Sequence, residues 1–376
     1  MRFGSSQLKQ ALTGSFDKRY VADVVFNGTR VKKDIPIVSP QFSDSGSAQV
    51  QSTGSCTIVY QDDFGASIAP AGIGDILAPF GSQIALSVIV EAGAGFQERV
   101  PMGTYLITED PTIATTRMKV NGGIIAKGDR VDLTLKDMFA GVQRDRFDTP
   151  GVAPDLTSVW KEYQRLVGMP ITKTITDAAI PTSVAYQEDK LQACYDLATV
   201  LDAVAYMTSD GTASMRPNAW PTAVDTLNSK DIDPDGGTLV SVTPSLANDD
   251  VYNAVVVRGT ASDGSTIVLA KSEITDGPLR VRNPDGSLSP YRRVPYYYSS
   301  QYITTQQQAQ AYADQMLPRV SKLRSLTYQV VEIFNPLREV GDVLNVNRLG
   351  QSFLGRVTDI RRDSGATQTL TMAVNP

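Results

Sequence analysis

The chain contains 376 residues, 41% of them hydrophobic, so it is long enough for two or three domains with apolar cores. Its net charge of −5 argues against a nucleic-acid-binding protein, and its charged fraction of 20% argues against wholesale disorder. The absence of histidine excludes Ser-His-Asp catalysis, Cys-His catalysis and any His-ligated metal site within this chain.

Signals for targeting and for disulfide bonds are sparse. The first 20 residues have no apolar core of the kind found in signal peptides, and the chain has no run of about 18 apolar residues. We therefore expect a protein that is made and folded in a cytoplasm and has no membrane anchor. Cys56 and Cys194 are too few for a disulfide framework, so two separate buried thiols are expected, although the sequence leaves their pairing open.

A first β domain is predicted for residues 20–150, after an N-terminal segment of residues 1–19. Runs of β-branched residues flank Asn27-Gly28, a pair that is typical of tight hairpins. Turn residues, Asn121-Gly122-Gly123 among them, separate the other short strands that we expect. These strands are predicted at residues 56–60, 83–91, 104–108, 117–120 and 130–135. Their spacing indicates an antiparallel barrel or sandwich.

Residues 151–235 are predicted to form a small α/β domain. Apolar residues recur at helical spacing over residues 155–167 and again over residues 188–204. A hairpin is expected around Asp210-Gly211, directly after the second helix. The polar stretch 229–237 is interpreted as a linker to the next domain.

Strands return in residues 236–376, which we interpret as a second β domain. Two β-branched runs flank Asp263-Gly264 and predict a hairpin. After a loop-rich insertion, Thr305 has the spacing of a capping box and begins an amphipathic helix over residues 305–317. Pro318 is expected to kink or end that helix.

The stretch from Asn335 to Ile360 alternates apolar and polar residues around several glycines. We expect Gly341-Asp342 to form the turn between two tightly paired strands. Gly350 and Gly355 follow in the next hairpin, where a small barrel requires bends.

One motif suggests a metal site. The sequence Asp231-Ile-Asp233-Pro-Asp235-Gly236 matches the first half of a calcium loop, in which carboxylates and a glycine turn surround the cation. The match then fails, because the twelfth position is Val242 rather than Glu. A solvated turn between domains is the alternative interpretation. No other metal and no cofactor is expected.

Adjacent acidic residues do not predict an enzyme. The pairs are Asp62-Asp63, Glu109-Asp110 and Asp249-Asp250. A glycosidase needs two carboxylates that face each other across a cleft, roughly 5–10 Å apart. Neighbouring residues of a strand point to opposite faces, so solvated turns and strand ends explain these pairs better. Phosphate-binding loops and the nucleophile-elbow motif are also missing, and we expect no catalytic residues.

A basic and aromatic cluster is the main candidate for an interface. It consists of Arg292, Arg293, Tyr296, Tyr297 and Tyr298. Tyrosine and arginine are enriched at the centres of protein interfaces, and such clusters also bind sugars or nucleic acid. On an extended chain Tyr296 and Tyr298 share one side. Protein contact, ordinary burial in a strand and ligand binding all remain open.

Several segments, taken in their order along the chain, resemble one protein family. They are VDLTLKDMFAGVQRDRFDTP, YQEDKLQACYDLATVLDAVAYMTSDGTASMRP, VYNAVVVRG, YITTQQQAQAYADQML, NPLREVGDVLNV and RDSGATQTLTMAV. The chain resembles the hub proteins at the distal end of bacteriophage tails, which include minor tail proteins of long-tailed phages and the hubs of contractile injection machines. The resemblance covers most of the chain from about residue 50.

The resemblance implies a mainly β fold with two small antiparallel β-barrel domains, joined by the small α/β domain. In such hubs three chains form a ring of six similar barrels, which matches a sixfold tail tube on one side and threefold symmetry on the other. A short internal similarity agrees with two related barrels, because Gly74-Asp-Ile-Leu and Gly341-Asp-Val-Leu each precede an apolar strand. Ring contacts are expected from barrel strands and from one face of the helix at 305–317.

The implied function is structural and not enzymatic. The protein would be a virion component, a homotrimeric hub that joins the tail tube or distal tail protein to receptor-binding or tail-tip proteins. DNA would pass through its lumen, and mild acidity would keep phosphates from sticking to the walls. Two alternatives stay open: a glycan-binding module that uses the tyrosine-rich insertion, and a carboxylate cell-wall hydrolase carried on a tail.

Overall fold

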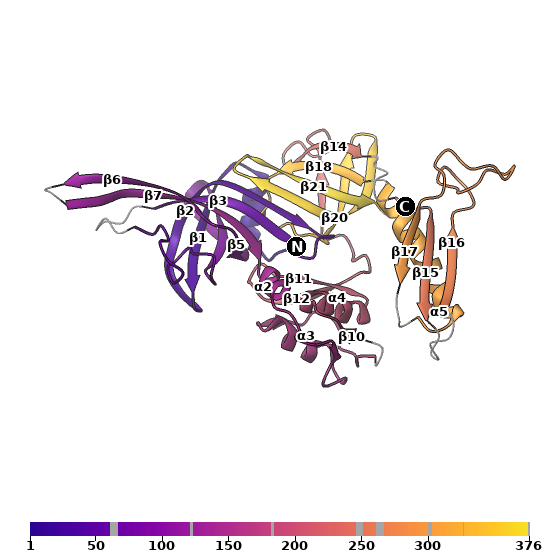
Figure 1. The fold of residues 1–376 in the computed structure, drawn as a ribbon. Helices are drawn as coiled ribbons and strands as arrows, with labels where there is room; N and C mark the ends of the chain where they lie inside the picture. The colour runs from indigo at the N-terminus through magenta and orange to yellow at the C-terminus, as the bar shows by residue number, and fades with distance from the viewer. Residues whose placement is uncertain are drawn as a thin grey trace. The chain divides into compact units, whose positions relative to one another are not determined.

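The computed structural model describes residues 1–60, 67–120, 123–181, 184–245, 251–260, 267–299, 303–325 and 327–374. Strands account for 47% and helices for 15% of it, which confirms the expectation of a mainly β chain. The chain divides into two compact units (Figure 1). Unit 1 comprises Met1–Ser241, Val330–Ser352 and Arg356–Leu370, and unit 2 comprises Val242–Gln329, Phe353–Gly355 and Thr371–Pro376.

Six strands of unit 1, called the first strand set below, pair in a closed circuit. In pairing order they are β1 (Phe16–Phe26), β4 (Gln83–Ala92), β5 (Phe96–Ile107), β7 (Gly123–Asp137), β3 (Ser52–Tyr60) and β2 (Thr29–Ser45). Because β1 also pairs with β2, the order returns to its start. The side chains inside are apolar, with Ile58, Val88 and Leu133 at most 2% exposed, and helix α1 (Ser6–Thr13) adds Leu8 to this core.

Two predicted hairpins of unit 1 are confirmed. Asn27 and Gly28 both have positive φ angles, 50° and 72°, and Phe26 pairs directly with Thr29 across the turn. This geometry matches the twist of the flanking strands and favours the Asn-Gly pair. The second hairpin lies around Gly211, whose φ angle is 79°, between two strands of the middle region.

β6 (Thr112–Val120) and the first half of β7 form a two-stranded ribbon that extends beyond the first strand set (Figure 1). Its register runs from the pair Thr112–Asp132 to the pair Val120–Gly123. The strands predicted at 117–120 and 130–135 are therefore parts of longer strands, because cross-strand pairing continues well past the segments of high β-propensity. The predicted turn residues Asn121 and Gly122 lie outside the described residues.

A second group of six strands, the second strand set, follows the order β13, β19, β20, β21, β18 and β14. Their bounds are β13 (Asp225–Asn228), β14 (Leu239–Ser245), β18 (Thr327–Ile333), β19 (Val343–Arg348), β20 (Gln351–Asp363) and β21 (Thr367–Val374). The two ends of this order approach each other through one parallel bridge between Ser229 and Leu239. β2 of the first set pairs with β20 of the second, so both sets belong to one sheet.

The prediction for Gly341-Asp342 is wrong, because these residues do not connect paired strands. β18 lies between β21 and β14, whereas β19 pairs with β13 and β20. Gly341 instead has a φ angle of 94°, and the position of its missing Cβ lies 3.1 Å from Cδ of Arg216. Position 341 therefore favours glycine, because of its positive φ angle and because a Cβ atom would lie close to the side chain of Arg216. Local turn patterns do not reveal this contact with a distant residue.

The middle region of unit 1 contains the predicted helices. Its elements are α2 (Phe139–Arg144), β8 (Gly151–Val152), α3 (Val159–Val167), β9 (Ile171–Thr172), β10 (Ala185–Tyr186), α4 (Lys190–Val200), β11 (Ala203–Met207) and β12 (Ala213–Pro217). α3 ends at Gly168, which is left-handed as such a stop requires. The second helix is shorter than predicted, because Ala203 and Ala205 are buried in β11, which pairs with β12.

Unit 2 contains a three-stranded sheet with one helix. The elements are β15 (Ala254–Thr260), β16 (Ile267–Glu273), β17 (Pro295–Ser299) and α5 (Gln306–Ser325). β15 is central, pairing antiparallel with β16 and parallel with β17. The pairing of β15 with β16 confirms the predicted hairpin, although Asp263 and Gly264 lie outside the described residues.

The capping box of α5 is confirmed. Thr305 Oγ1 accepts a hydrogen bond from the Gln308 backbone N–H, and Gln308 Oε1 accepts one from the Thr305 N–H. The helix continues through Pro318 to Ser325, so the predicted end at residue 317 is wrong. Within the described residues, no helix has both the length and the apolar character needed to cross a membrane.

Candidate functional site at the junction of the strand sets

The pairing of β2 with β20 joins the two strand sets. Gln41 lies opposite Asp363, Ser43 opposite Arg361 and Ser45 opposite Asp359. On its other edge β2 pairs with β3, which pairs in turn with β7. Four neighbouring strands, β7, β3, β2 and β20, therefore cross from one set to the other without interruption. Their two faces differ sharply in chemistry.

The inner face at the junction carries a buried network of ions, called the junction network below. Arg362 donates to the Asp44 carboxylate at 2.6 Å and to the Arg338 carbonyl at 2.6 Å. Arg338, only 1% exposed, makes an ion pair of 3.1 Å with Glu332, which is 0% exposed. Gln368 Nε2 donates to Glu332 Oε1 at 2.7 Å. Each buried charge has a partner, as burial of ions requires.

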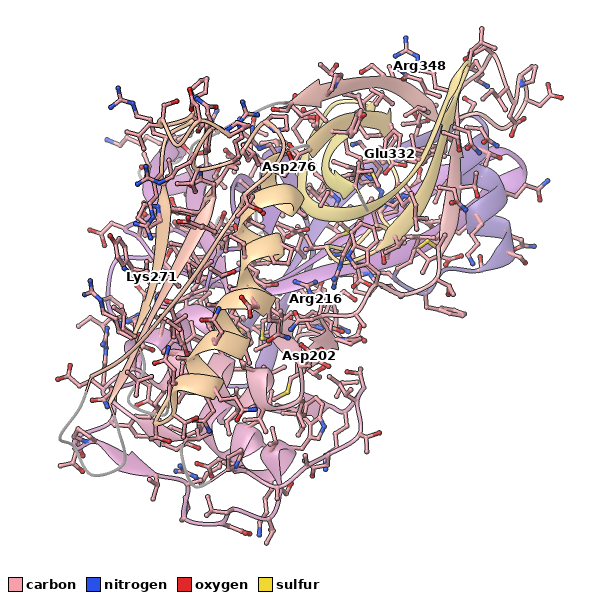
Figure 2. All side chains as sticks on the ribbon, turned by 90° about the vertical axis from the view of Figure 1, so that its right-hand side faces the viewer. Asp202, Arg216, Lys271, Asp276, Glu332 and Arg348 are labelled. Atoms are coloured by element: carbon pink, nitrogen blue, oxygen red, sulfur yellow. The ribbon has the colours of Figure 1, made fainter. Side chains whose placement is uncertain are left out.

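Further contacts and the electrostatics agree with this pairing. Arg338 also reaches Asp225 at 2.7 Å. Burial alone would raise the pKa of Asp44, but the neighbouring Arg362 and Arg2 hold that pKa below its ordinary value. Burial alone would lower the pKa of Arg338, and the Glu332 carboxylate more than offsets this. Figure 2 shows Glu332 enclosed by the curved C-terminal strands, whereas Arg348 lies at their rim.

The sequence analysis missed these residues, although a signal was present. In the strand segment SLTYQVVEIF, Glu332 has the same parity as Val330 and Phe334, both of which are buried. A charged residue on the buried face of an alternating strand indicates a paired ion. The partner Arg338 follows six residues later, in a loop that local patterns leave undefined.

The outer face of the same four strands is rich in hydroxyl groups. Two rows of side chains cross it, in strand order Lys136, Thr53, Ser43 and Arg361, and Thr134, Ser55, Gln41 and Asp363. Their sequence neighbours Phe42 and Leu135 point into the core instead. A polar groove of about 580 Å³ lies along these rows. Four of these eight side chains carry hydroxyl groups, and three are charged: Lys136, Arg361 and Asp363.

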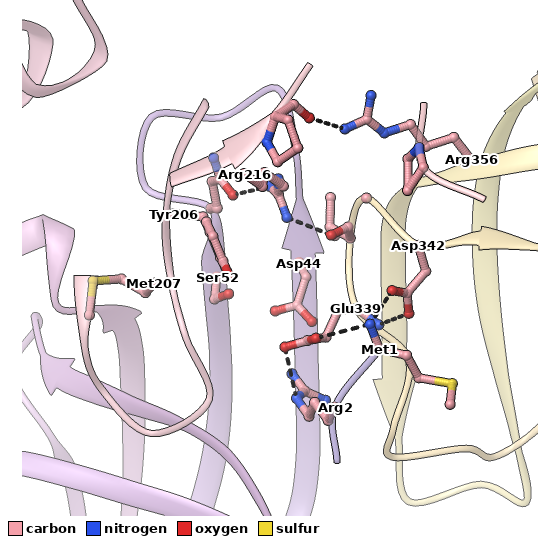
Figure 3. Close-up of a pocket in the computed structure, with 15 residues that line it drawn as sticks. Met1, Arg2, Asp44, Ser52, Tyr206, Met207, Arg216, Glu339, Asp342 and Arg356 are labelled. Atoms are coloured by element: carbon pink, nitrogen blue, oxygen red, sulfur yellow. Dashed lines mark hydrogen bonds and ion pairs between the residues drawn. The ribbon is translucent and has the colours of Figure 1, made fainter. Parts of the chain in front are cut away.

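A second polar cavity, of about 210 Å³, lies where the middle region meets the junction (Figure 3). Arg216 spans it, donating at 2.5 Å to the Val340 carbonyl and at 2.5 Å to Gln51 Oε1, with its guanidinium 4.9 Å from the centre of the Tyr206 ring. Burial lowers the pKa of Arg216. This side chain connects three segments that are far apart in the sequence.

The three carboxylates of this cavity are all engaged. Asp44 belongs to the junction network, and Asp342 accepts from the Glu339 N–H at 2.8 Å and from the Met1 ammonium group. Glu339 makes an ion pair of 3.6 Å with Arg2. Such an arrangement fixes chain segments and leaves no pair of carboxylates poised over a substrate.

A buried carboxylate also marks the end of β7. Asp137 accepts hydrogen bonds from the Ser52 N–H at 2.7 Å and from the Phe139 N–H at 2.9 Å, the latter at the start of α2. Burial raises the pKa of Asp137 to about 7 in spite of these bonds. The carboxyl therefore connects the first strand set to the middle region.

The predicted tyrosine cluster divides between core and surface. Tyr296 packs edge-on against Tyr252, and Tyr298 stacks on Tyr312 of α5 at 4.2 Å between ring centres. Tyr297 points the other way, is 58% exposed and has the guanidinium of Arg258 over its ring at 5.3 Å. The shared side of Tyr296 and Tyr298 is thus the buried side.

The two predicted arginines lie on the surface beside this strand. Arg293 makes an ion pair of 3.5 Å with Glu273, and Arg292 has a positive φ angle of 62°. The Arg292 carbonyl accepts from the side chain of buried Asn253, whose Oδ1 accepts from the Val294 N–H. Asn253 thereby holds the insertion that carries the arginines.

The predicted calcium ligands Asp231 and Asp233 accept hydrogen bonds from backbone N–H groups. Asp233 Oδ1 accepts from the Gly236 N–H at 2.9 Å, and Asp231 Oδ2 accepts from the Leu349 N–H at 3.1 Å. Lys230 donates to the Asp235 carbonyl, so this residue contributes through its main chain. The described part of the chain brings no three His, Cys, Asp or Glu side chains together as a metal site. Calcium binding stays a prediction.

The two cysteines are both buried and free, as expected. Cys56 lies in the core of the first strand set and Cys194 in that of the middle region. Burial raises the pKa of Cys56 to about 12 and also raises that of Cys194. Among the acidic pairs, Asp62-Asp63 and Asp249-Asp250 lie outside the described residues.

Comparisons with known proteins identify solved structures that share this fold. No protein-family model and no curated protein sequence matches the chain. The tail protein of Neisseria meningitidis MC58 matches with a TM-score of 0.57 at 13% identity, over 94% of this chain and 96% of that one. The 43 kDa tail protein of prophage MuSo2 from Shewanella oneidensis matches with a TM-score of 0.57 at 12% identity, over 95% and 98%.

A chain of the Francisella PdpA–VgrG complex matches with a TM-score of 0.51 at 9% identity, over 98% of this chain and 55% of that one. At such identities the likeness concerns the fold alone. The full-length matches nevertheless agree with the resemblance drawn from the ordered motifs. The chain has the fold of phage tail proteins.

Proposed function

We propose that the protein is a structural phage tail protein, a distal hub that forms a homotrimeric ring. The observation that carries this proposal is the presence of two six-strand sets in one chain, joined by β2 and β20. In this proposal each set forms one small barrel, in residues 20–150 and 236–376, with residues 151–235 as the α/β domain between them. The second barrel also takes β13 from the end of that middle segment. Three copies then supply six similar modules to a sixfold tube.

The junction gives such a hub its rigidity. Adjacent modules of a ring must keep a constant angle, and a continuous sheet with a buried ion network resists bending better than a flexible linker does. Asp44 comes from the first set, whereas Arg362 and Glu332 come from the second. Their pairing therefore supports a fixed relation between the two modules.

The hydroxyl-rich outer face is a suitable wall for a channel. DNA binds to proteins mainly through phosphate contacts with lysine and arginine, and the two cations of these rows, Lys136 and Arg361, are accompanied by Asp363, so the rows carry a net charge of +1. Short Ser and Thr side chains present no aromatic platform for bases. We assign this face to the lumen through which DNA passes.

The exposed surface of unit 2 supplies contacts to other tail proteins. Tyr297, Arg292 and Arg293 are its candidate contact residues, and the exposed side of α5, which includes Gln307 and Gln315, extends it. The partners are the tail tube or distal tail protein on one side and receptor-binding or tail-tip proteins on the other. The protein is synthesised in the host cytoplasm and works in the virion.

The assembly state tests this function. Light scattering after size-exclusion chromatography gives the mass of the purified protein, alone and mixed with the tube protein of the same phage. A mass of three chains, or a trimer formed on the tube protein, supports the hub. A strict monomer in both samples overturns it. A zymogram on cell walls checks the non-enzymatic assignment, and clearing that tracks the purified chain contradicts it.

The contact surface has its own test. Tyr297→Ala removes an exposed ring and is expected to weaken binding to a tail partner while the free energy of unfolding stays within about 0.5 kcal/mol. Tyr298→Ala is the matched control, because it removes a ring that packs on α5 and destabilises unit 2 by about 3 kcal/mol. Unchanged partner binding by Tyr297→Ala removes this residue from the interface.

A further inference from the structure

The ribbon of β6 and β7 has no partner on its own chain among the described residues. β6 pairs only with β7, and Gly123–Gly128 of β7 pair only with β6. The described side chains of β6 from Thr112 to Lys119 are all exposed. A two-stranded ribbon is marginal in water by itself, so this element gains most of its order from a surface that covers it.

The ribbon differs in charge from the rest of the chain. Residues 112–132, over which β6 and β7 pair, contain four cations, Arg117, Lys119, Lys127 and Arg130, and two acids, Asp129 and Asp132, a net charge of +2. Because the whole chain has a net charge of −5, the remainder carries −7. Opposite charges on two parts of one chain favour contact between two copies, since each copy supplies both the basic element and the acidic surface.

Apolar side chains and open strand edges add to this complementarity. Ile113 is 41% exposed and Met118 is 44% exposed, and the ribbon sequence also contains Val120, Ile124 and Ile125. Unpaired strand edges accept another strand readily, and proteins usually cover or charge them. Among the described residues, the ribbon therefore offers an unpaired backbone edge, the exposed apolar side chains of Ile113 and Met118, and the exposed lysine Lys119.

From these observations we propose that the β6–β7 ribbon is an arm that docks on a second copy of this chain. This proposal rests on the self-association proposed above. The arm makes a heterologous contact, in which the ribbon of one copy lies on an acidic surface of the next, and such contacts close into rings. Its lysine and arginine charges guide the approach, and Ile113 and Met118 become buried on docking.

Removal of the arm is the first test. Residues 117–127 are replaced by Asn-Gly, which keeps a tight turn because Thr116 and Gly128 lie opposite each other. Because no described residue of β6 contributes to the core, the thermal unfolding midpoint is expected to stay unchanged while the oligomer dissociates to monomer. If the shortened protein assembles like the wild type, the proposal that the ribbon is a docking arm is contradicted, whereas the proposed hub function is not. If the wild type itself is a strict monomer, both proposals are contradicted.

A charge reversal gives a finer test. Lys119→Glu is expected to weaken self-association at least about tenfold, measured by sedimentation at several protein concentrations, because a like charge then meets the acidic surface. Lys271→Glu is the matched control, an exposed lysine on β16 of unit 2 whose reversal leaves the association constant unchanged. Equal effects of both reversals, or none of either, overturn the proposal.

Crosslinking identifies directly the protein on which the ribbon docks. A photoreactive group introduced at Met118 is expected to yield peptides from a second copy, which mixed isotope-labelled and unlabelled protein distinguishes from crosslinks within one chain. Crosslinks only within the chain, or only to added tube protein, contradict the proposal. Binding of duplex DNA that disappears with the arm would likewise reassign the ribbon to nucleic acid.

Discussion

The two strand sets have the same number of strands but are closed and filled differently. The first set closes through five register pairs between β1 and β2, around apolar side chains such as Ile58 and Leu133. The second closes through one bridge, Ser229 to Leu239, and contains the buried pair of Glu332 and Arg338 beside buried apolar side chains such as Val346 and Leu370. The second module therefore adds paired ions to the apolar burial that both modules share.

The two strand sets contribute buried side chains to each other. Asp44, which belongs to the first set, neutralises Arg362 of the second. The first set thus supplies part of the second set's interior, in addition to the sheet edge that β20 uses. In return, Phe334 and Leu337, which follow β18 of the second set, lie in the apolar core of the first.

The largest expected effect comes from opening the junction network. Arg338→Leu leaves the Glu332 carboxylate buried without its cation, which should lower the free energy of unfolding by about 3–5 kcal/mol. Chemical denaturation gives the size, and hydrogen exchange should place the loss of protection in β18, β20 and β21.

The double variant Glu332→Gln with Arg338→Met is the control, because it removes both charges together. It should cost clearly less than Arg338→Leu. Equal loss of protection in both strand sets would show that they unfold as one, and would contradict the difference drawn between them.

A cavity in the first set should have the next largest effect. Ile58→Ala is expected to cost about 2–5 kcal/mol, because Ile58 is fully buried among apolar neighbours. Hydrogen exchange should show weakened protection in both sets, since the second set uses β2. Loss of hydrogen-exchange protection in the first set alone would mean that the junction contributes little to the stability of the second set.

A close contact at the junction should have a moderate effect. A Cβ on Gly54 would lie 2.3 Å from Cδ1 of Phe42 and 2.7 Å from the Gln41 carbonyl oxygen. Gly54→Ala should therefore cost about 1–3 kcal/mol in thermal denaturation. Gly74→Ala, where nothing lies within 4 Å, is the control and should change little. A neutral Gly54→Ala would show that β2 and β3 separate easily.

The last expected effect concerns the pH dependence of stability. Asp137 has its pKa raised from 3.8 to about 7, so the folded chain holds a proton that the unfolded chain releases, and stability should fall as pH rises from about 4 to 7. Asp44 acts oppositely, because its lowered pKa adds stability that is lost as pH falls below 3.8. Asp137→Asn should flatten the fall between pH 4 and 7, and Glu109→Gln, at an exposed site, should not. If the stability of Asp137→Asn depends on pH in the same way as that of the wild type, a group other than Asp137 causes the dependence.

Local patterns predicted much of the secondary structure. The hairpin at Asn27-Gly28, the helix that ends at Gly168 and the capping box at Thr305 each depend on neighbours within a few residues. Such interactions leave a direct trace in the sequence. The order of motifs along the chain also predicted the fold that the solved tail proteins share.

The sequence alone indicated which segments form strands, hairpins and helices, because hydrophobic period and turn chemistry act over short distances. Only the tertiary structure decided which strands pair, that Gly341 faces Arg216 rather than forming a hairpin, and that Asp44 meets Arg362 across 318 positions of sequence. Pairing partners and buried ions are chosen by contacts between distant segments, and a single sequence holds no local signal for that choice.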